Sequence, residues 1–247
     1  MKNRNILLIG FLFCTLRLFA QTEYTVNLYD AQRERIVPIA IYEPKHVNKH
    51  TPVIIFNHGY GQNAPDSYIS YSCLTKPLAM KGYYVISIQH ELPNDLPLAM
   101  SGNFMKTRMP NWERGVENIL FTIKEFKKFK PKLSWNNITI MGHSNGGDMA
   151  MLFAAKHPTM AQKIISLDHR RMVMPRCSSP KVYTLRGSDY GADENVIPTV
   201  EEQQKYHISV IQLDDIKHGD MDNKGKREQH DTCLLYTSPS PRDMRRS

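Results

Sequence analysis

The sequence has 247 residues and a formal net charge of +8, but much of that charge lies near its two ends. Residues 1–20 contribute +3 and residues 233–247 contribute +2, which leaves +3 for residues 21–232. Such a small excess excludes the concentrated basic face that nucleic-acid binding needs. Residues 21–232 are enough for one domain with a full hydrophobic core, and no internal repeat divides them.

The first twenty residues predict a signal peptide. Lys2 and Arg4 precede an apolar stretch from Ile6 to Phe19, which is too short to span a bilayer comfortably, and Ala20 is a small residue at a plausible cleavage point. We therefore expect a periplasmic or secreted protein with no membrane span after cleavage. An N-terminal anchor that stays uncleaved is the alternative.

The mature chain is expected to open with strands. Residues 24–30 and 35–42 alternate between polar and apolar side chains, which predicts a half-exposed antiparallel pair. Residues 52–57 form a continuous apolar run, typical of a central strand buried on both faces. This run ends in His58-Gly59-Tyr60-Gly61, where His58 fits a structural histidine that holds the following loop.

The next segment predicts a helix and a further buried strand. The helix covers residues 68–81, and Pro77 indicates a kink or a division into two pieces. The strand covers residues 82–90. The His90-Glu91 pair at its exit lacks further ligands at a useful spacing, so we do not assign a metal site.

Residues 92–110 contain three prolines and several methionines, which suits either a substrate-facing rim or a loop packed on the fold. Residues 111–130 place apolar side chains at helical spacing, and four lysines near their end are expected on the solvated side.

The stretch that organises the chain follows. A β-branched, apolar run over residues 138–141 predicts a buried strand, and the Ala- and Met-rich run over residues 148–155 predicts a helix. Between them lies Gly142-His143-Ser144-Asn145-Gly146. A turn this tight excludes side chains at positions 142 and 146, and it directs the Ser144 hydroxyl toward the positive end of the helix.

Three more buried strands are expected over residues 163–168, 181–186 and 208–213. Only about a dozen residues separate the first two, so no sizeable lid fits there and the site should be open. Strands alternating with helices predict an α/β fold with one mostly parallel sheet and helices on both faces.

The Gly-x-Ser-x-Gly turn resembles the nucleophile elbow of the α/β-hydrolase superfamily. With the His58-Gly59 loop and a histidine after the last strand, the chain from about residue 24 to 232 is similar to its compact esterase, dienelactone-hydrolase and platelet-activating-factor-acetylhydrolase-like members. The resemblance implies an α/β-hydrolase fold, Ser144 as nucleophile, and backbone N–H groups of Tyr60 and Asn145 as an oxyanion hole. It implies neither a metal nor an organic cofactor.

The resemblance also implies a base after the last strand and an acid before it. His218 is the expected base, with His207 and His230 as alternatives. For the acid we prefer Asp189, because it lies near the end of a strand, where support is rigid. The alternatives for the acid are Asp193, Glu194 and Asp168.

Residues 233–247 resemble the conceptual translation of a transposase adapter used to build sequencing libraries. We expect this run to be non-native and the native final helix to be cut off. It has two prolines and no amphipathic period, which predicts no helix, and a genuine disordered tail is the alternative. In residues 21–232 only Cys73 and Cys177 remain, and they either pair or stay as two free thiols.

These patterns predict an exported serine hydrolase that cleaves a small-molecule carboxylic ester through an acyl-enzyme on Ser144. Amide or peptide hydrolysis and acyl transfer are alternatives on the same fold. A non-catalytic binding protein is an alternative of a different class, because fold alone does not confer activity. The patterns favour no particular oligomeric state.

Overall fold

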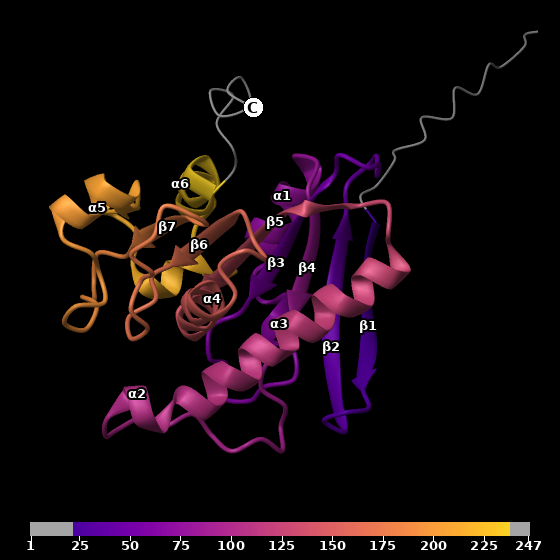
Figure 1. Cartoon of the computed structure of the whole chain (residues 1–247), viewed down its shortest axis with the longest axis horizontal. Helices are drawn as coiled ribbons and strands as arrows, with labels where there is room; N and C mark the ends of the chain where they lie inside the picture. The colour runs from indigo at the N-terminus through magenta and orange to yellow at the C-terminus, as the bar shows by residue number, and fades with distance from the viewer. Residues whose placement is uncertain (1–21, 238–247) are drawn as a thin grey trace, which may run out of the picture.

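The computed structural model describes residues 22–237, which form one eight-stranded sheet in the order β1-β2-β4-β3-β5-β6-β7-β8 (Figure 1). β1 and β2 pair antiparallel, as do β2 and β4, and the other neighbours are parallel. The expected signal peptide and residues 238–247 lie outside the described residues. The strands are β1 (Thr22–Asp30), β2 (Arg35–Glu43), β3 (Pro52–Asn57), β4 (Tyr84–Ile88), β5 (Ser134–His143), β6 (Lys163–Leu167), β7 (Lys181–Arg186) and β8 (Ser209–Gln212).

Successive side chains of the central strands enter two separate hydrophobic cores. Val53 and Ile55 of β3 belong to one core, and Ile54 and Phe56 belong to the other, as the two-residue period of a strand requires. Helices α3 (Met109–Phe129) and α4 (Asn145–Lys156) cover the first core, and α3 crosses in front of the sheet in Figure 1. Helices α1 (Ser72–Met80) and α6 (Arg227–Thr237) cover the second. The predicted sheet, with helices on both faces, is confirmed.

The helix expected over residues 68–81 is divided, but not at Pro77. A short 3-10 helix, η1 (Ser67–Ile69), precedes α1, and Pro77 lies inside α1. The remaining short helices are α2 (Phe104–Thr107), α5 (Val200–Tyr206) and the 3-10 helix η2 (His218–Met221). Helix α5 is not among the predicted helices, although Thr199 and Glu202 form a capping box at its start.

The expectation that the run from residue 233 forms no helix is wrong for its first five residues. Helix α6 continues to Thr237, and its buried side chains His230, Cys233, Leu234 and Thr237 share one face. The prolines that argued against a helix stand at positions 239 and 241, beyond its end. Cys73, Cys177 and Cys233 are all free thiols, so the possible pairing of the first two does not occur.

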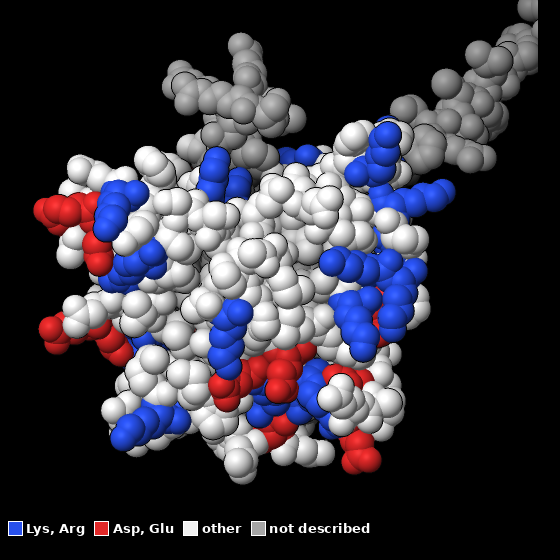
Figure 2. All heavy atoms as spheres, in the orientation of Figure 1, with Lys and Arg blue, Asp and Glu red and all other residues white. Residues whose placement is uncertain are grey.

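The basic cluster at the end of α3 lies on the surface, as expected. Figure 2 shows Lys and Arg side chains over this part of the molecule with acidic side chains nearby. Lys128 Nζ lies 2.7 Å from Glu125 Oε1, and Lys130 Nζ lies 2.8 Å from Glu43 Oε1. These cations also lie near the negative end of the helix, which favours them. Within residues 22–237, no helix combines the length and apolar character that crossing a membrane requires.

Candidate active site

Ser144 lies in the turn between β5 and α4, as predicted. Its backbone has φ 51° and ψ −119°, a strained conformation for a residue other than glycine. The neighbouring glycines are required by close approach of the backbone. A Cβ on Gly142 would lie 2.2 Å from the Gly146 carbonyl oxygen, and a Cβ on Gly146 would lie 2.2 Å from that of Asn57. The turn leaves Ser144 half-buried at the N-terminus of α4.

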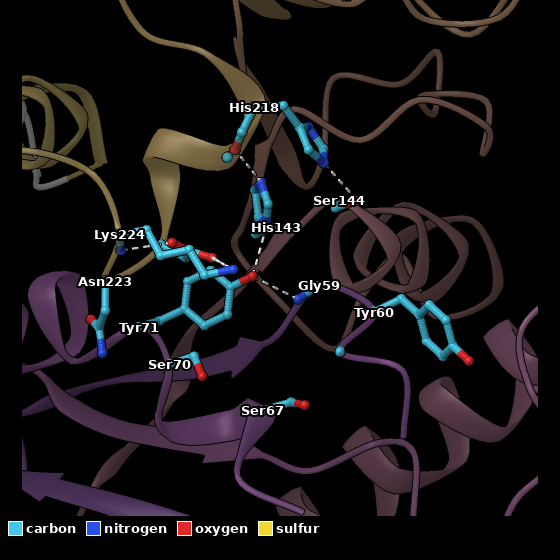
Figure 3. Close-up of a pocket in the computed structure, with 13 residues that line it drawn as sticks. Gly59, Tyr60, Ser67, Ser70, Tyr71, His143, Ser144, His218, Asn223 and Lys224 are labelled. Carbon is cyan, nitrogen blue, oxygen red and sulfur yellow. Dashed lines mark hydrogen bonds and ion pairs between the residues drawn. The ribbon is translucent and has the colours of Figure 1, made fainter. Parts of the chain in front are cut away.

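His218, at the start of η2, faces Ser144. Its Nε2 lies 3.0 Å from Ser144 Oγ, and its Nδ1 lies 2.6 Å from Asp168 Oδ2 (Figure 3 shows the pair with serine). Because an ionised carboxylate can only accept, Nδ1 carries the proton and donates it to Asp168. Nε2 is then free to accept a hydrogen bond from the serine hydroxyl. This arrangement is the one that prepares a serine for nucleophilic attack.

Asp168 is fully buried and directly follows β6. Its Oδ1 accepts a hydrogen bond from Gly187 N at 3.0 Å and forms an ion pair with Arg186 Nη2 at 2.9 Å. Burial alone would raise the pKa of this carboxyl. The hydrogen bond from His218 and the charge of Arg186 outweigh burial, so the pKa lies below its ordinary value. The carboxylate is therefore ionised where it faces the imidazole.

The expectation that Asp189 lies against the imidazole of His218 is corrected by this geometry. Asp189 Oδ1 instead accepts the backbone N–H of His218 at 2.7 Å. Asp189 is exposed and lies three residues beyond the end of β7, whereas Asp168 follows its strand immediately. The criterion of rigid support at a strand end was sound, but it favours Asp168 over Asp189.

The remaining sequence alternatives lie elsewhere. Asp193 forms an ion pair with Arg171, and Glu194 is exposed. His207 caps the C-terminus of α5, and His230 Nε2 lies 2.7 Å from a backbone carbonyl oxygen in the segment before α6. None of these four side chains has a hydrogen bond to Ser144 or His218 in the described part of the chain.

Next to Ser144, a buried chain of hydrogen bonds joins the loop after β3 to the segment that carries His218 (Figure 3). Gly59 N donates to Tyr71 Oη at 3.0 Å, and Tyr71 Oη lies 2.7 Å from His143 Nδ1. His143 Nε2 lies 3.0 Å from the His218 carbonyl oxygen, so Nε2 must carry the proton and Tyr71 must donate to Nδ1. Burial and then the nearby His218 lower the pKa of His143 to about 3, which keeps it neutral.

The backbone N–H groups of Tyr60 and Asn145 have no hydrogen-bond acceptor within residues 22–237. That of Asn145 is one of the first in α4, where the helix supplies no partner. His58 Nε2 accepts from His90 N at 3.0 Å, so its Nδ1 donates to the Gly59 carbonyl oxygen at 2.6 Å. That carbonyl belongs to the same planar peptide unit as the Tyr60 N–H, so His58 sets the direction of this donor.

Three buried hydrogen bonds hold the side chain of Asn145. Its Nδ2 donates to Glu91 Oε1 at 3.1 Å and to Asn111 Oδ1 at 2.9 Å, and its Oδ1 accepts from Trp112 Nε1 at 2.8 Å. The first turn of α4 is thereby anchored to the exit of β4 and to α3. Neither these partners nor Tyr71 can be recognised from the sequence, because nothing in the local pattern around each residue distinguishes it from an ordinary buried residue.

A cavity of about 310 Å³ opens beside Ser144. Tyr71 and His218 line it together with polar side chains such as Ser67 and Asn223 (Figure 3). The segment between β6 and β7 contains no helix or strand, in agreement with the expectation that no sizeable lid lies there. Within residues 22–237, no three His, Cys, Asp or Glu side chains are grouped so that they could hold a metal ion.

Comparison with protein-family models matches residues 39–176, more than half of the chain, to the family described as BD-FAE. Among curated proteins, a probable serine hydrolase of Drosophila melanogaster is 43% identical over 37 residues, which is 15% of this chain and 11% of that protein. A serine hydrolase-like protein of Mus musculus is 26% identical over 101 residues, which is 41% of this chain and 31% of that protein. The matches thus span about a tenth and a third of the length of these relatives.

Solved structures agree on the fold. A thermostable esterase aligns with a TM-score of 0.56 and 18% identity over 77% of this chain and 53% of its own. Esterase 2 of Thermogutta terrifontis, phosphorylated by paraoxon, aligns with a TM-score of 0.65 and 12% identity over 87% of this chain and 91% of its own. At these identities the alignments establish the α/β-hydrolase fold alone, and they do not identify the reaction.

Proposed function

The chain belongs to the BD-FAE family, and from this premise we propose that it hydrolyses carboxylic esters through an acyl-enzyme on Ser144. The observation that carries the proposal is the position of His218 between two partners, with Ser144 Oγ at 3.0 Å and Asp168 Oδ2 at 2.6 Å. Asp168 replaces Asp189 as the proposed acid of the triad. The proteins of similar fold are a thermostable esterase and esterase 2 of Thermogutta terrifontis, which supports the choice of an ester.

In the proposed reaction, His218 Nε2 takes the proton of Ser144 as its Oγ attacks the ester carbonyl carbon. The negative charge that forms on the carbonyl oxygen is stabilised by the backbone N–H groups of Tyr60 and Asn145. When the tetrahedral intermediate collapses, His218 returns the proton to the departing alkoxide, and an acyl-serine remains. Water then repeats the same sequence and releases the acid. Asp168 keeps the imidazole in the required tautomer and stabilises its charged form.

Labelling with a fluorophosphonate tests whether Ser144 is activated. A serine that is not deprotonated by a base reacts negligibly, so we expect the wild-type protein to be labelled and Ser144→Ala to remain unlabelled. An unlabelled wild-type protein that is correctly folded would leave the non-catalytic binding protein as the better assignment. Comparison of short p-nitrophenyl esters with aminoacyl anilides then separates an esterase from an amidase, and addition of an alcohol acceptor reveals acyl transfer.

Export to the periplasm or the medium is the second part of this proposal, and it rests on the basic and apolar pattern of residues 1–20. The mature protein should then begin near Gln21. Fractionation of cells that express the chain, followed by N-terminal sequencing, tests this directly. Recovery of the protein in the cytosol with Met1 or Lys2 at its N-terminus would contradict export.

A further inference from the structure

Arg170 lies close to the candidate active site, two residues after Asp168. The backbone that follows it is held by two hydrogen bonds. The buried carboxylate of Asp148 accepts the N–H groups of Arg171 and Met172 at 2.9 and 2.8 Å. The Arg170 carbonyl oxygen also accepts from Asp193 N at 2.9 Å. A firmly held backbone therefore carries this half-buried side chain.

The guanidinium of Arg170 differs from those of the arginines around it. Arg171 pairs with Asp193, and Arg186 pairs with Asp168. Within residues 22–237, the Arg170 guanidinium forms no hydrogen bond or ion pair, and its nitrogens are not among the buried unsatisfied atoms. It is therefore a cation whose donors remain accessible.

An aromatic ring connects Arg170 to the base. The Arg170 Cζ atom lies 4.3 Å from the centroid of the Tyr190 ring, and the Tyr190 ring meets the His218 imidazole edge-on at 6.3 Å between centroids. Stacking on an aromatic ring occupies one face of a guanidinium and leaves its N–H edges open.

The geometry points to Arg170, stacked on Tyr190, as a subsite for a carboxylate on the ester substrate. This inference rests on the proposed function, which it extends by naming a substrate class: esters that carry a carboxylate on the acyl or the alcohol part, beyond the bond that is cleaved. A planar guanidinium with open edges binds a carboxylate through two parallel hydrogen bonds. Asp189, next to Tyr190 in sequence, forms no ion pair with this guanidinium within residues 22–237, and its Oδ1 accepts the His218 N–H.

Two pairs of esters test the inference, each matched in size and differing in charge. One pair is 4-acetoxybenzoate and its methyl ester, with the charge on the alcohol part. The other is mono-(4-nitrophenyl) adipate and its methyl ester, with the charge on the acyl part. Each is measured with the wild-type protein, with Arg170→Gln, and with the control Lys224→Gln, which removes an exposed cation at the cavity.

We expect Arg170→Gln to lower kcat/KM for at least one anionic ester by about tenfold to a hundredfold, and to leave both neutral methyl esters within about twofold. Added salt should reduce the preference of the wild-type protein for that ester. Lys224→Gln should keep the preference. An equal response of charged and neutral esters to Arg170→Gln, or a loss of the preference in Lys224→Gln alone, overturns the inference. Absence of hydrolysis of all four esters, together with no fluorophosphonate labelling, would instead reject the proposed function.

Discussion

The site has two regions that differ in burial and in hydrogen bonding. The floor, formed by Gly59, Tyr71, His143 and Asn145, is buried, and each of these residues takes part in hydrogen bonds of 2.7 to 3.1 Å. The rim, formed by Arg170, Asp189 and Tyr190, is exposed or half-buried and has few internal partners. The difference indicates that the floor fixes the geometry of the reaction, while the rim remains available to distinguish substrates.

The largest expected effect lies where the floor meets the cavity. Ser144→Ala removes the attacking oxygen and should lower kcat for any ester by about 10⁴-fold or more while leaving the melting temperature nearly unchanged. Ser70→Ala, another serine that lines the cavity, is the matched control and should keep activity within about threefold. Hydrolysis of p-nitrophenyl acetate measures both. Comparable losses in the two variants would show that Ser144 has no special role.

The second prediction compares a buried carboxylate with a carboxylate of the rim. Asp168→Asn should lower kcat by about 10³-fold to 10⁴-fold, because an amide cannot hold the imidazole in the required tautomer. Asp189→Asn should cost less than about fivefold, since its amide oxygen can still accept the N–H of His218. The kcat of each variant on p-nitrophenyl acetate decides between the two acids. A reversed order of effects would restore the assignment that the sequence favoured.

The third prediction tests whether the hydrogen bonds of the floor affect the reaction by holding the residues of the site in position. Tyr71→Phe removes the hydroxyl that links Gly59 to His143, and we expect kcat to fall about tenfold with little change in KM. Tyr68→Phe, which changes another buried tyrosine on the same face of the sheet, is the control. Equal values of kcat for the two variants would indicate that the link to His143 only stabilises the fold.

The last prediction concerns stability, and it involves Asp148, whose carboxylate accepts the backbone N–H groups of Arg171 and Met172. Burial raises the pKa of its carboxyl to about 6, above the value of about 3.9 for an unfolded chain. The folded state therefore binds this proton more tightly, and stability should fall by roughly 3 kcal/mol in total as pH rises from about 4 to above 6. In Asp148→Asn this component is lost. Urea unfolding between pH 4.5 and 7 measures it, with exposed Asp231→Asn as the control, and parallel curves for all three proteins would contradict the assignment.

The sequence predicted the parts of the site that follow from chain order and local pattern. Ser144 was found because a strand, a tight Gly-x-Ser-x-Gly turn and a helix follow one another, and His218 was placed by its position after the last strand. The sheet was predicted from alternating and continuous apolar runs. These signals depend on neighbours in sequence, so they can be recognised without coordinates.

The remaining contacts depend on the directions in which side chains point, and local sequence patterns do not encode these directions. Asp168 turns its carboxylate toward His218 from a backbone with φ 53°, and Tyr71 meets His143 across 72 positions of sequence. Asp189 and Asp168 both follow strands that are neighbours in the sheet, so sequence position alone does not separate them. Only the packed loops decide which carboxylate reaches the imidazole.

The bond between His143 and the segment of the base has a consequence for protein engineering. Its acceptor is the main-chain carbonyl oxygen of His218, so the bond does not involve the His218 imidazole. The donor, His143, precedes Ser144 in the turn between β5 and α4. A change at position 190 therefore leaves this support of residue 218 in place, whereas a change at position 189 removes the carboxylate that accepts the N–H of residue 218. A substitution that removes the imidazole of His143 would remove this support of residue 218.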